Sequence, residues 1–419
     1  LKGRASHIEL PEETADGTGG ATHLRLLDGA RLCGVKATPR ADGAMHWAVL
    51  RYEQPRLAGG TAMVIREERL RIRLGEMDPL GDESGHAIAV AQLATVRHED
   101  AVPQLAAVRH EERVLRTNVK LLASDLARRA FPSDSAASEV LRRSGPRRVG
   151  LGSRICCQAD MEEDWVRHWC AVLGMAPACH RKVWEDCFVP QALWEAGMLL
   201  PGHRGLGFAV GREPLPRIFA ERGVEVLATD LDPADERARA WLDTNQHAAR
   251  LEAASGDAPS DMSAAQGRIR YRPVDMACIP DDLLRLEFDF IWSVCSLEHL
   301  GSLEAGEAFV RTAMRCLRPG GIAVHTTEYN VDPDGETLAA GGTVFYQRRH
   351  LDRLARSLAA EGHEMLPFQD PPGAPKLFDR LVDLPPYPHQ GGPADTPHLR
   401  LALAGHTVTS AGIILRAGR

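Results

Sequence analysis

A glycine-bearing turn between an apolar segment and a helix-like segment is the strongest constraint on how this chain folds. The turn, Gly205-Leu206-Gly207-Phe208-Ala209-Val210-Gly211, is followed by a helix expected through residues 218–220 and by an apolar segment that ends on Asp230. Glycines let a ligand approach the backbone closely, and a carboxylate at the tip of the next strand can accept hydrogen bonds from a ribose diol. The pattern predicts a nucleotide-binding βαβ unit, although such turns also occur without a ligand.

The details of the turn disfavour a dinucleotide. Dinucleotide sites require G-x-G-x-x-G and a helix N-terminus that faces a pyrophosphate, whereas Pro214 and Pro216 stand at the start of this helix. A Tyr-x-x-x-Lys proton relay is also missing from the sequence. A nucleotide-dependent oxidoreductase is therefore a weak alternative.

A second acid follows the next predicted strand. Residues 269–274 are strand-like and lead to Asp275 and Met276. A carboxylate accepts a hydrogen bond from the exocyclic amine of adenine, and a thioether packs on the ring face. Two more strands are predicted at 288–294 and at 322–327, the latter after a tight turn.

These four segments, in this order and spacing, resemble class I S-adenosylmethionine (SAM)-dependent methyltransferases, most clearly over residues 200–330. The resemblance implies an α/β fold with a seven-stranded, mostly parallel, Rossmann-like sheet, and SAM as the cofactor. The family commonly has a glycine where Ala209 stands. The residues that the resemblance assigns to cofactor binding are Gly205, Gly207, Ala209, Gly211, Asp230, Asp275, Met276 and Ser293.

Methyl transfer requires a nucleophile in line with the methyl group and often one base. The candidates at the tips of the fourth and fifth strands are His299, Glu298 and Glu328. His299 is the first choice, because an imidazole titrates near neutral pH. Its alternative role is to pack or cap the following helix. No D-x-D pair or His triad in the sequence suggests a required metal, so no metal is expected.

The acceptor site is predicted in the C-terminal region, where residues 370–398 are rich in proline and polar side chains. Residues 180–185 resemble a feature of a bacterial methyltransferase subgroup associated with polysaccharide and glycoconjugate loci. With only 5% aromatic residues, the composition disfavours a flat apolar acceptor. The residues assigned to the acceptor are Arg181, Tyr329, Asp379, Arg380, His398 and Arg400.

Together these features predict O-methylation of a hydroxyl on a sugar or glycoconjugate. N-methylation of a small amine is the nearer alternative. A methyltransferase-fold binding or assembly module without catalysis is a third, and residues 370–398 can equally form a solvated loop.

Composition and patterning predict three regions and a cytoplasmic protein. The net charge of −7, without a basic face, argues against nucleic acid, and no apolar run approaches the roughly 20 residues of a membrane span. The expected partner is a small-molecule or glycan acceptor. The regions are a β-rich part at 1–86, a connecting helix and linkers at 87–152, and a methyltransferase domain at 153–419, divided into a helical cover (153–200), a cofactor-binding core (201–330) and an acceptor loop with sheet completion (331–419).

The cysteines lack a C-x-x-C pair, which favours reduced thiols. Buried apolar thiols are the main interpretation of the cysteine-rich segment, and a zinc site is the alternative. The residues concerned are Cys156, Cys157, Cys170, Cys179, His180 and Cys187.

Overall fold

The computed structural model divides into two compact units, residues 1–115 and 116–419, which are considered separately. It describes residues 98–132, 135–243, 246–247, 267–387 and 395–418, together with five strands before residue 73. Side chains are described from residue 110 onward, except at 133–138 and at 240. The predicted start of the connecting helix at residue 87 lies outside the described residues.

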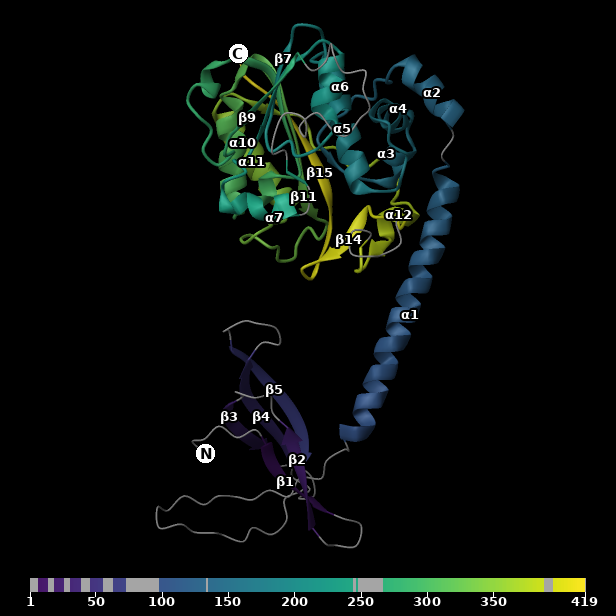
Figure 1. Ribbon diagram of the computed structural model, residues 1–419, viewed down its shortest axis with the longest axis vertical. Coiled ribbons are helices and arrows are strands. Elements are labelled where there is room, and N and C mark those ends of the chain that lie inside the picture. Colours follow the sequence, from purple (N-terminus) through teal and green to yellow (C-terminus); the bar gives the residue numbers. More distant parts are fainter. Residues whose placement is uncertain are drawn as a thin grey trace. The chain divides into compact units, whose positions relative to one another are not determined.

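The first unit contains two antiparallel sheets (Figure 1). Strands β1 and β2 form one of them, and β3, β4 and β5 form the other. The alternating arginines and aliphatics that begin at residue 69 lie at the end of β5. The strands are β1 (His7–Glu13), β2 (Gly19–Arg25), β3 (Arg31–Thr38), β4 (His46–Pro55) and β5 (Met63–Ile72).

Two helices, α1 (His98–Ala130) and α2 (Ser135–Ser144), precede the main sheet. α2 lies within the region 87–152, where the sequence predicts one connecting helix and linkers. In α1, Lys120 forms an ion pair of 2.8 Å with the buried Asp383. The contacts between residues divide the chain into units between residues 115 and 116. The sequence instead predicts the start of the methyltransferase domain at residue 153.

The second unit is built on a mixed, mostly parallel sheet, as predicted. Its order is β13-β14-β15-β11-β10-β7-β8-β9, and β6 and β12 add to the edge of β15. The pairs from β9 through to β11 are parallel, and β15 runs antiparallel to β11. The strands are β6 (Arg154–Ile155), β7 (Arg204–Gly207), β8 (Glu225–Asp230), β9 (Ile269–Pro273), β10 (Phe288–Val294), β11 (Leu317–Asn330), β12 (Glu364–Met365), β13 (Val382–Asp383), β14 (Arg400–Leu403) and β15 (His406–Arg416).

The prediction of seven strands falls short of the ten in this sheet. The difference comes from β6, β12 and β13, which have two residues each. Segments this short carry no period-two pattern, so the sequence gives no sign of them.

Helices cover both faces of the sheet (Figure 1). Side chains alternate between the faces along a strand. In β10, Phe290 and Trp292 pack with the helices on one face, while Ile291 packs with those on the other. Both faces are therefore buried, which explains why β10 is almost continuously apolar. The first face is covered by α4 (Asp164–Leu173), α5 (Arg181–Glu195) and α6 (Leu215–Glu221), and the second by α10 (Leu303–Met314) and α11 (Arg348–Ala360).

The remaining elements are short. Within the described residues, no helix is both long enough and apolar enough to cross a membrane. The short helices are α3 (Gln158–Glu162), η1 (Glu236–Ala238), α7 (Arg239–Asp243), η2 (Leu283–Arg285), η3 (Leu297–His299) and α12 (Leu377–Arg380).

Candidate active site

A cavity of about 410 Å³ opens at the carboxyl ends of β7, β8 and β10, where loops and helix starts converge. Ligands of open α/β sheets bind at this edge, and the volume is typical of a small-molecule site. The lining residues are Lys182, Asp186, Ala209, Val210, Gly211, Arg212, Glu213, Asp230, Leu231, Arg237, Trp241, Gln246, His247, Val274, Asp275, Met276, Val294, Cys295, Ser296, His299 and Leu300.

The glycine turn after β7 forms one wall of the cavity with unusual backbone angles. Ala209 has φ 47° and Gly211 has φ 53°, in the left-handed region that favours glycine. A Cβ on Gly211 would lie 2.5 Å from the carbonyl oxygen of Gln246. Gly211 is thus required both by its angle and by this close approach. Ala209 adopts the conformation for which the family commonly uses glycine.

Asp230, the last residue of β8, is held at the cavity by the backbone. Its Oδ2 accepts a hydrogen bond from the Gly211 amide at 3.2 Å, and its Oδ1 accepts one from the Leu231 amide at 2.8 Å. The residue is 7% exposed. The two backbone donors thus fix the carboxylate at the end of β8, in the wall of the cavity.

The acid after β9 is held by a neighbouring arginine. Arg237 donates to Asp275 Oδ2 at 2.8 Å, and the Ala277 amide donates to Asp275 Oδ1 at 2.9 Å. Met276 lies beside it in the cavity wall and is 8% exposed. This wall thus offers a fixed carboxylate next to a polarisable apolar surface.

His299 lies at the end of η3, after β10. Its Nδ1 and the carbonyl oxygen of Gly342 are 2.9 Å apart, so Nδ1 carries the hydrogen and donates it. The ring packs edge-on against Trp241, with centroids 5.6 Å apart. This tautomer leaves the Nε2 lone pair of a cavity-lining imidazole available as a base.

A buried polar cluster adjoins the inner end of the cavity, where α5 begins. α5 starts after His180, whose ring accepts a hydrogen bond from the Lys182 amide at 3.1 Å. Its first two turns present Arg181, Lys182, Glu185 and Asp186 toward the ends of β10, β11 and β15. Burial raises the pKa of Asp186 to about 7, with Glu185 adding to the effect and Lys182 opposing it.

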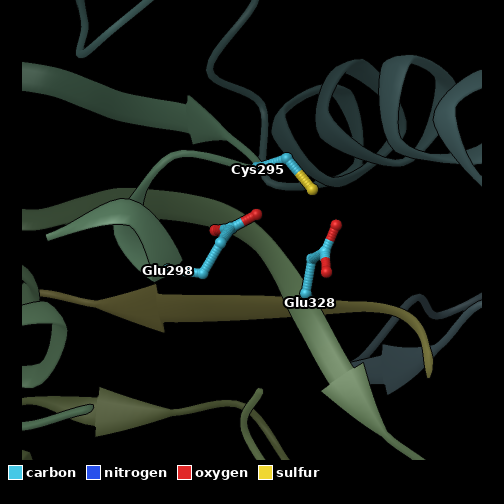
Figure 2. Close-up of side chains that lie close together, drawn as sticks. All are labelled: Cys295, Glu298 and Glu328. Atoms are coloured by element: carbon cyan, nitrogen blue, oxygen red, sulfur yellow. The ribbon is translucent and has the colours of Figure 1, made fainter. Parts of the chain in front are cut away.

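Three side chains of this cluster converge from different elements (Figure 2). Cys295 follows β10 and has φ 46°, Glu298 lies in η3 and Glu328 in β11. Their ligand atoms all lie within 4.8 Å of one another. Burial, reinforced by Glu185 and Glu298, raises the pKa of Cys295, which keeps it a thiol.

The structure brings part of the predicted cofactor set together. Ala209, Gly211, Asp230, Asp275 and Met276 line the cavity, as does the candidate base His299. The remaining predicted cofactor residues, Gly205, Gly207 and Ser293, do not.

Each of these three residues has a role in packing. Gly205 and Gly207 pair with β10, and a Cβ on either would collide with the ring of Phe290 or Trp292. Ser293 is fully buried, with its Oγ 2.8 Å from His325 Nδ1. The two glycines are therefore explained by aromatic packing, independently of any ligand.

None of the residues predicted to bind the acceptor lines the cavity. Arg181 donates to Glu328 at 2.7 Å, within the buried cluster. Tyr329 is 8% exposed and stacks on Phe368. Both lie on elements that reach the cavity region, although neither side chain contributes to its surface.

The other four belong to the C-terminal region. Asp379 Oδ1 accepts from the Gln158 amide at 2.7 Å. His398 bonds Asp383 at 2.8 Å, and Arg400 donates to the carbonyl oxygen of Cys156 at 2.9 Å. Arg380 is exposed at the end of α12. The contacts of the first three are within the protein, which is the physical reason why this group does not form a ligand site around the cavity.

Several cavity residues were not expected from the sequence. Lys182 and Asp186 come from the start of α5, and Arg237, Trp241 and His247 come from the segment after β8. The signal that could have found the first pair is the four charged residues within 181–186, a segment that also contains the buried Trp184. No comparable pattern marks the second group.

The cysteine-rich segment forms a buried interior. Cys156, Cys157, Cys170, Cys179 and Cys187 are all buried, and the sulfurs of Cys170 and Cys187 are 3.7 Å apart. Within the described part of the chain, the group with metal-ligand spacing is Cys295, Glu298 and Glu328 rather than these cysteines. The arrangement agrees with buried apolar thiols.

Comparison with known proteins finds a family model that matches the segment around this site. Residues 206–325 match the model of a family described as "Methyltransferase domain". This segment runs from β7 to the middle of β11 and contains most of the cavity wall. No protein with a curated function matches the chain.

Similar solved structures include three methyltransferases. Phosphoethanolamine N-methyltransferase 2 of Haemonchus contortus, in complex with S-adenosyl-L-methionine, is 18% identical over 42% of this chain and 36% of that one, with a TM-score of 0.29. Magnesium protoporphyrin IX methyltransferase of Synechocystis, with bound SAH, is 11% identical over 68% and 95%, with a TM-score of 0.35. A glycopeptide N-methyltransferase complexed with SAM is 14% identical over 54% and 92%, with a TM-score of 0.31.

The matched segment contains β7, β8, β9 and β10, and the cavity opens at the carboxyl ends of these strands. The likeness covers about a third of the length of the phosphoethanolamine enzyme. Together, the family match and the residues that line this cavity identify a SAM-dependent methyltransferase domain in this chain, with SAM as its cofactor.

Proposed function

We propose that this chain transfers the methyl group of SAM to a small-molecule acceptor that reaches the inner end of the cavity. The observation that supports this most is that a single cavity is lined by Asp230 and Gly211 and also by Lys182, Asp186 and Cys295 from other elements. The first pair suits a ribose beside the glycine turn. The second set provides a polar end for an acceptor.

The residues present fit SAM in both polarity and shape. Asp230 places a backbone-held carboxylate in the cavity wall, where it can accept from a diol, and Met276, with Val274 and Leu231, offers an apolar surface for a base. Gly211 keeps the backbone close to the ligand. When bound, SAM supplies an electrophilic methyl group on a positively charged sulfur.

We further propose His299 as the base when the nucleophile is a hydroxyl. Its Nδ1 is fixed as a donor to Gly342, so Nε2 is the atom that takes the proton. Positioned bases contribute about 10²- to 10⁴-fold to rate.

The sequence predicts a sugar or glycoconjugate hydroxyl as acceptor, from the polar C-terminal loop, the low aromatic content and the subgroup resemblance. Asp379, His398 and Arg400 instead make contacts within the protein. The cavity surface therefore lends no support to a sugar over another small molecule. N-methylation of an amine becomes the stronger alternative, for the reasons that follow in the next subsection.

An acceptor screen with methyl-labelled SAM tests this proposal. We expect label to appear in a small-molecule product, with a His299→Gln variant slowing transfer to a hydroxyl at least a hundredfold while SAM affinity changes only a few-fold. His363→Gln, which lies beyond α11 and away from the cavity, is the matched control. Absence of transfer to every acceptor, despite tight SAM binding, would contradict the proposal.

A further inference from the structure

The cluster of Cys295, Glu298 and Glu328 contains unsatisfied hydrogen-bond acceptors. Glu298 Oε2 accepts from Thr327 at 3.2 Å, and Glu328 Oε1 accepts from Arg181 at 2.7 Å. The second oxygen of each carboxyl group, Glu298 Oε1 and Glu328 Oε2, is buried without a hydrogen-bond partner. Glu298 is 0% and Glu328 7% exposed. Leaving such a group unpaired costs about 1 to 3 kcal/mol, and more if it is charged.

The two carboxyl groups point toward a common centre (Figure 2). Because the three ligand atoms lie within 4.8 Å of one another, some point lies no more than about 2.8 Å from all of them. That is the length of a hydrogen bond from a charged nitrogen to a carboxylate oxygen. The centre therefore suits a single nitrogen that donates several hydrogen bonds.

The charge around this centre is unbalanced. Four carboxyl groups, those of Glu185, Asp186, Glu298 and Glu328, surround two cations. Glu185 is fully engaged, since its oxygens accept from Ser410, Cys295, Thr326 and Lys182. The excess of negative charge remains at Glu298 and Asp186. Burial, and then Glu328, raises the pKa of Glu298, with His299 opposing.

The cluster borders the cavity through Cys295. Cys295 belongs to both, and its neighbours Val294 and Ser296 also line the cavity. Lys182 and Asp186 continue the lining from α5. A group held at the cluster is therefore next to the end of the cavity that we assign to methyl transfer.

We propose that Glu298 and Glu328 bind the ammonium group of a primary or secondary amine, and that this amine is the methyl acceptor. The proposal rests on the proposed function and names its substrate class. An ammonium group carries up to three N–H donors and can donate to both carboxyl groups at once, whereas a hydroxyl has one donor. It also brings the positive charge that the four carboxyl groups lack.

A metal ion is a poorer fit to the same centre. Metal binding requires a thiolate, whereas the Cys295 thiol donates a hydrogen bond to Glu185 at 3.4 Å. The Arg181 guanidinium lies 3.7 Å from the same sulfur and already pairs with Glu328. A divalent ion would bring two positive charges beside the Arg181 guanidinium, whereas an ammonium group brings one.

The transfer balances in protons and electrons. The bound ammonium loses one proton to the Glu298 carboxylate, which frees the nitrogen lone pair. That pair forms the new N–C bond with the methyl carbon, and the S–C bond breaks with its electrons remaining on sulfur. The products are an N-methylammonium, S-adenosylhomocysteine and one proton, which Glu298 releases to water.

Paired ligands that differ only in the nitrogen test the proposal without chemistry. The protein is saturated with S-adenosylhomocysteine, and binding of ethanolamine, putrescine and glucosamine is measured by ligand-detected NMR against ethylene glycol, 1,4-butanediol and glucose. We expect at least one amine to bind tenfold or more tightly than its alcohol. Glu298→Gln should remove this preference, while Glu236→Gln, an exposed residue with the same charge change, should retain it.

The same samples separate this inference from the proposed function. SAM titration of Glu298→Gln should give the affinity of the parent, which also shows that the variant is folded. If neither the parent nor the variants bind SAM, the proposed function fails. If SAM binds but no amine exceeds its alcohol, the amine class fails. Stoichiometric binding of Zn²⁺ or Co²⁺ that is lost in Glu298→Gln would assign the cluster to a metal and overturn the inference. Label from SAM confined to alcohols would overturn it as well.

Discussion

Replacing Asp186 by Asn should stabilise the methyltransferase unit at alkaline pH and much less at acidic pH. The carboxyl group lies in the second turn of α5, between the cavity and the buried Glu185. Burial raises its pKa from 3.8 to about 7, Glu185 contributes in the same direction, and Lys182 opposes. The native state therefore binds this proton more tightly than the unfolded state.

The sign of the effect follows from the raised pKa. Below about pH 4 both states are protonated and the residue costs nothing; as pH rises from 4 to 7 the unfolded state loses its proton first, and stability falls. At about 1.4 kcal/mol per pKa unit, the penalty has an upper bound of roughly 4 kcal/mol at pH 8 and under about 2 kcal/mol at pH 5. Because the side chain is partly exposed to the cavity, we expect about half of these values.

Thermal unfolding of the parent and of Asp186→Asn at pH 5, 6.5 and 8 measures this difference. A gain of about 2 kcal/mol at pH 8 corresponds to a rise in Tm of roughly 3 °C for a unit that spans residues 116–419. Asp281→Asn, at an exposed position, is the matched control and should shift Tm by little at any pH. A Tm difference for Asp186→Asn that does not grow between pH 5 and 8 would refute the reasoning.

Two further substitutions test other parts of the structure. Gly211→Ala should lower SAM affinity about tenfold in calorimetry, because a side chain at φ 53° is strained and would meet the carbonyl oxygen of Gln246 at 2.5 Å; unchanged affinity would show that this turn does not shape the site. Lys120→Ala should destabilise the second unit by about 1 to 3 kcal/mol in urea unfolding, because the buried Asp383 loses this cation and keeps only the contact with His398 among these two partners; a loss below 1 kcal/mol would show that α1 is not anchored there.

The sequence was informative wherever the structure depends on local periodicity. The apolar run at β10 and the turn that leads to Asp230 are both set by neighbouring residues, and both appear as predicted. The closing strand predicted at 407–415 is β15. The family resemblance likewise rested on residues that are contiguous within each motif.

Polar residues with distant partners could not be interpreted in the same way. His398 and Arg400 looked like ligand contacts because their partners, Asp383 and the carbonyl oxygen of Cys156, are not recognisable before folding. Gly205 and Gly207 have the composition of a ligand loop, yet they accommodate the aromatic rings of the adjacent strand.

For the buried cluster, the sequence indicates the residues and does not indicate that they lie together. Glu298 and Glu328 were chosen as single candidate bases, since each follows a strand. Only the tertiary structure shows that they converge with Cys295 and that both have an unpaired oxygen.

The most direct test of the central claim is calorimetric titration of SAM into the parent and into Asp230→Asn. The account predicts that the parent binds one SAM per chain and that the variant loses about 2 kcal/mol, more than tenfold in affinity, because two hydrogen bonds to a charged acceptor are weakened. Asp281→Asn should bind like the parent. Equal affinity of Asp230→Asn and the parent would contradict the assignment of this cavity to SAM.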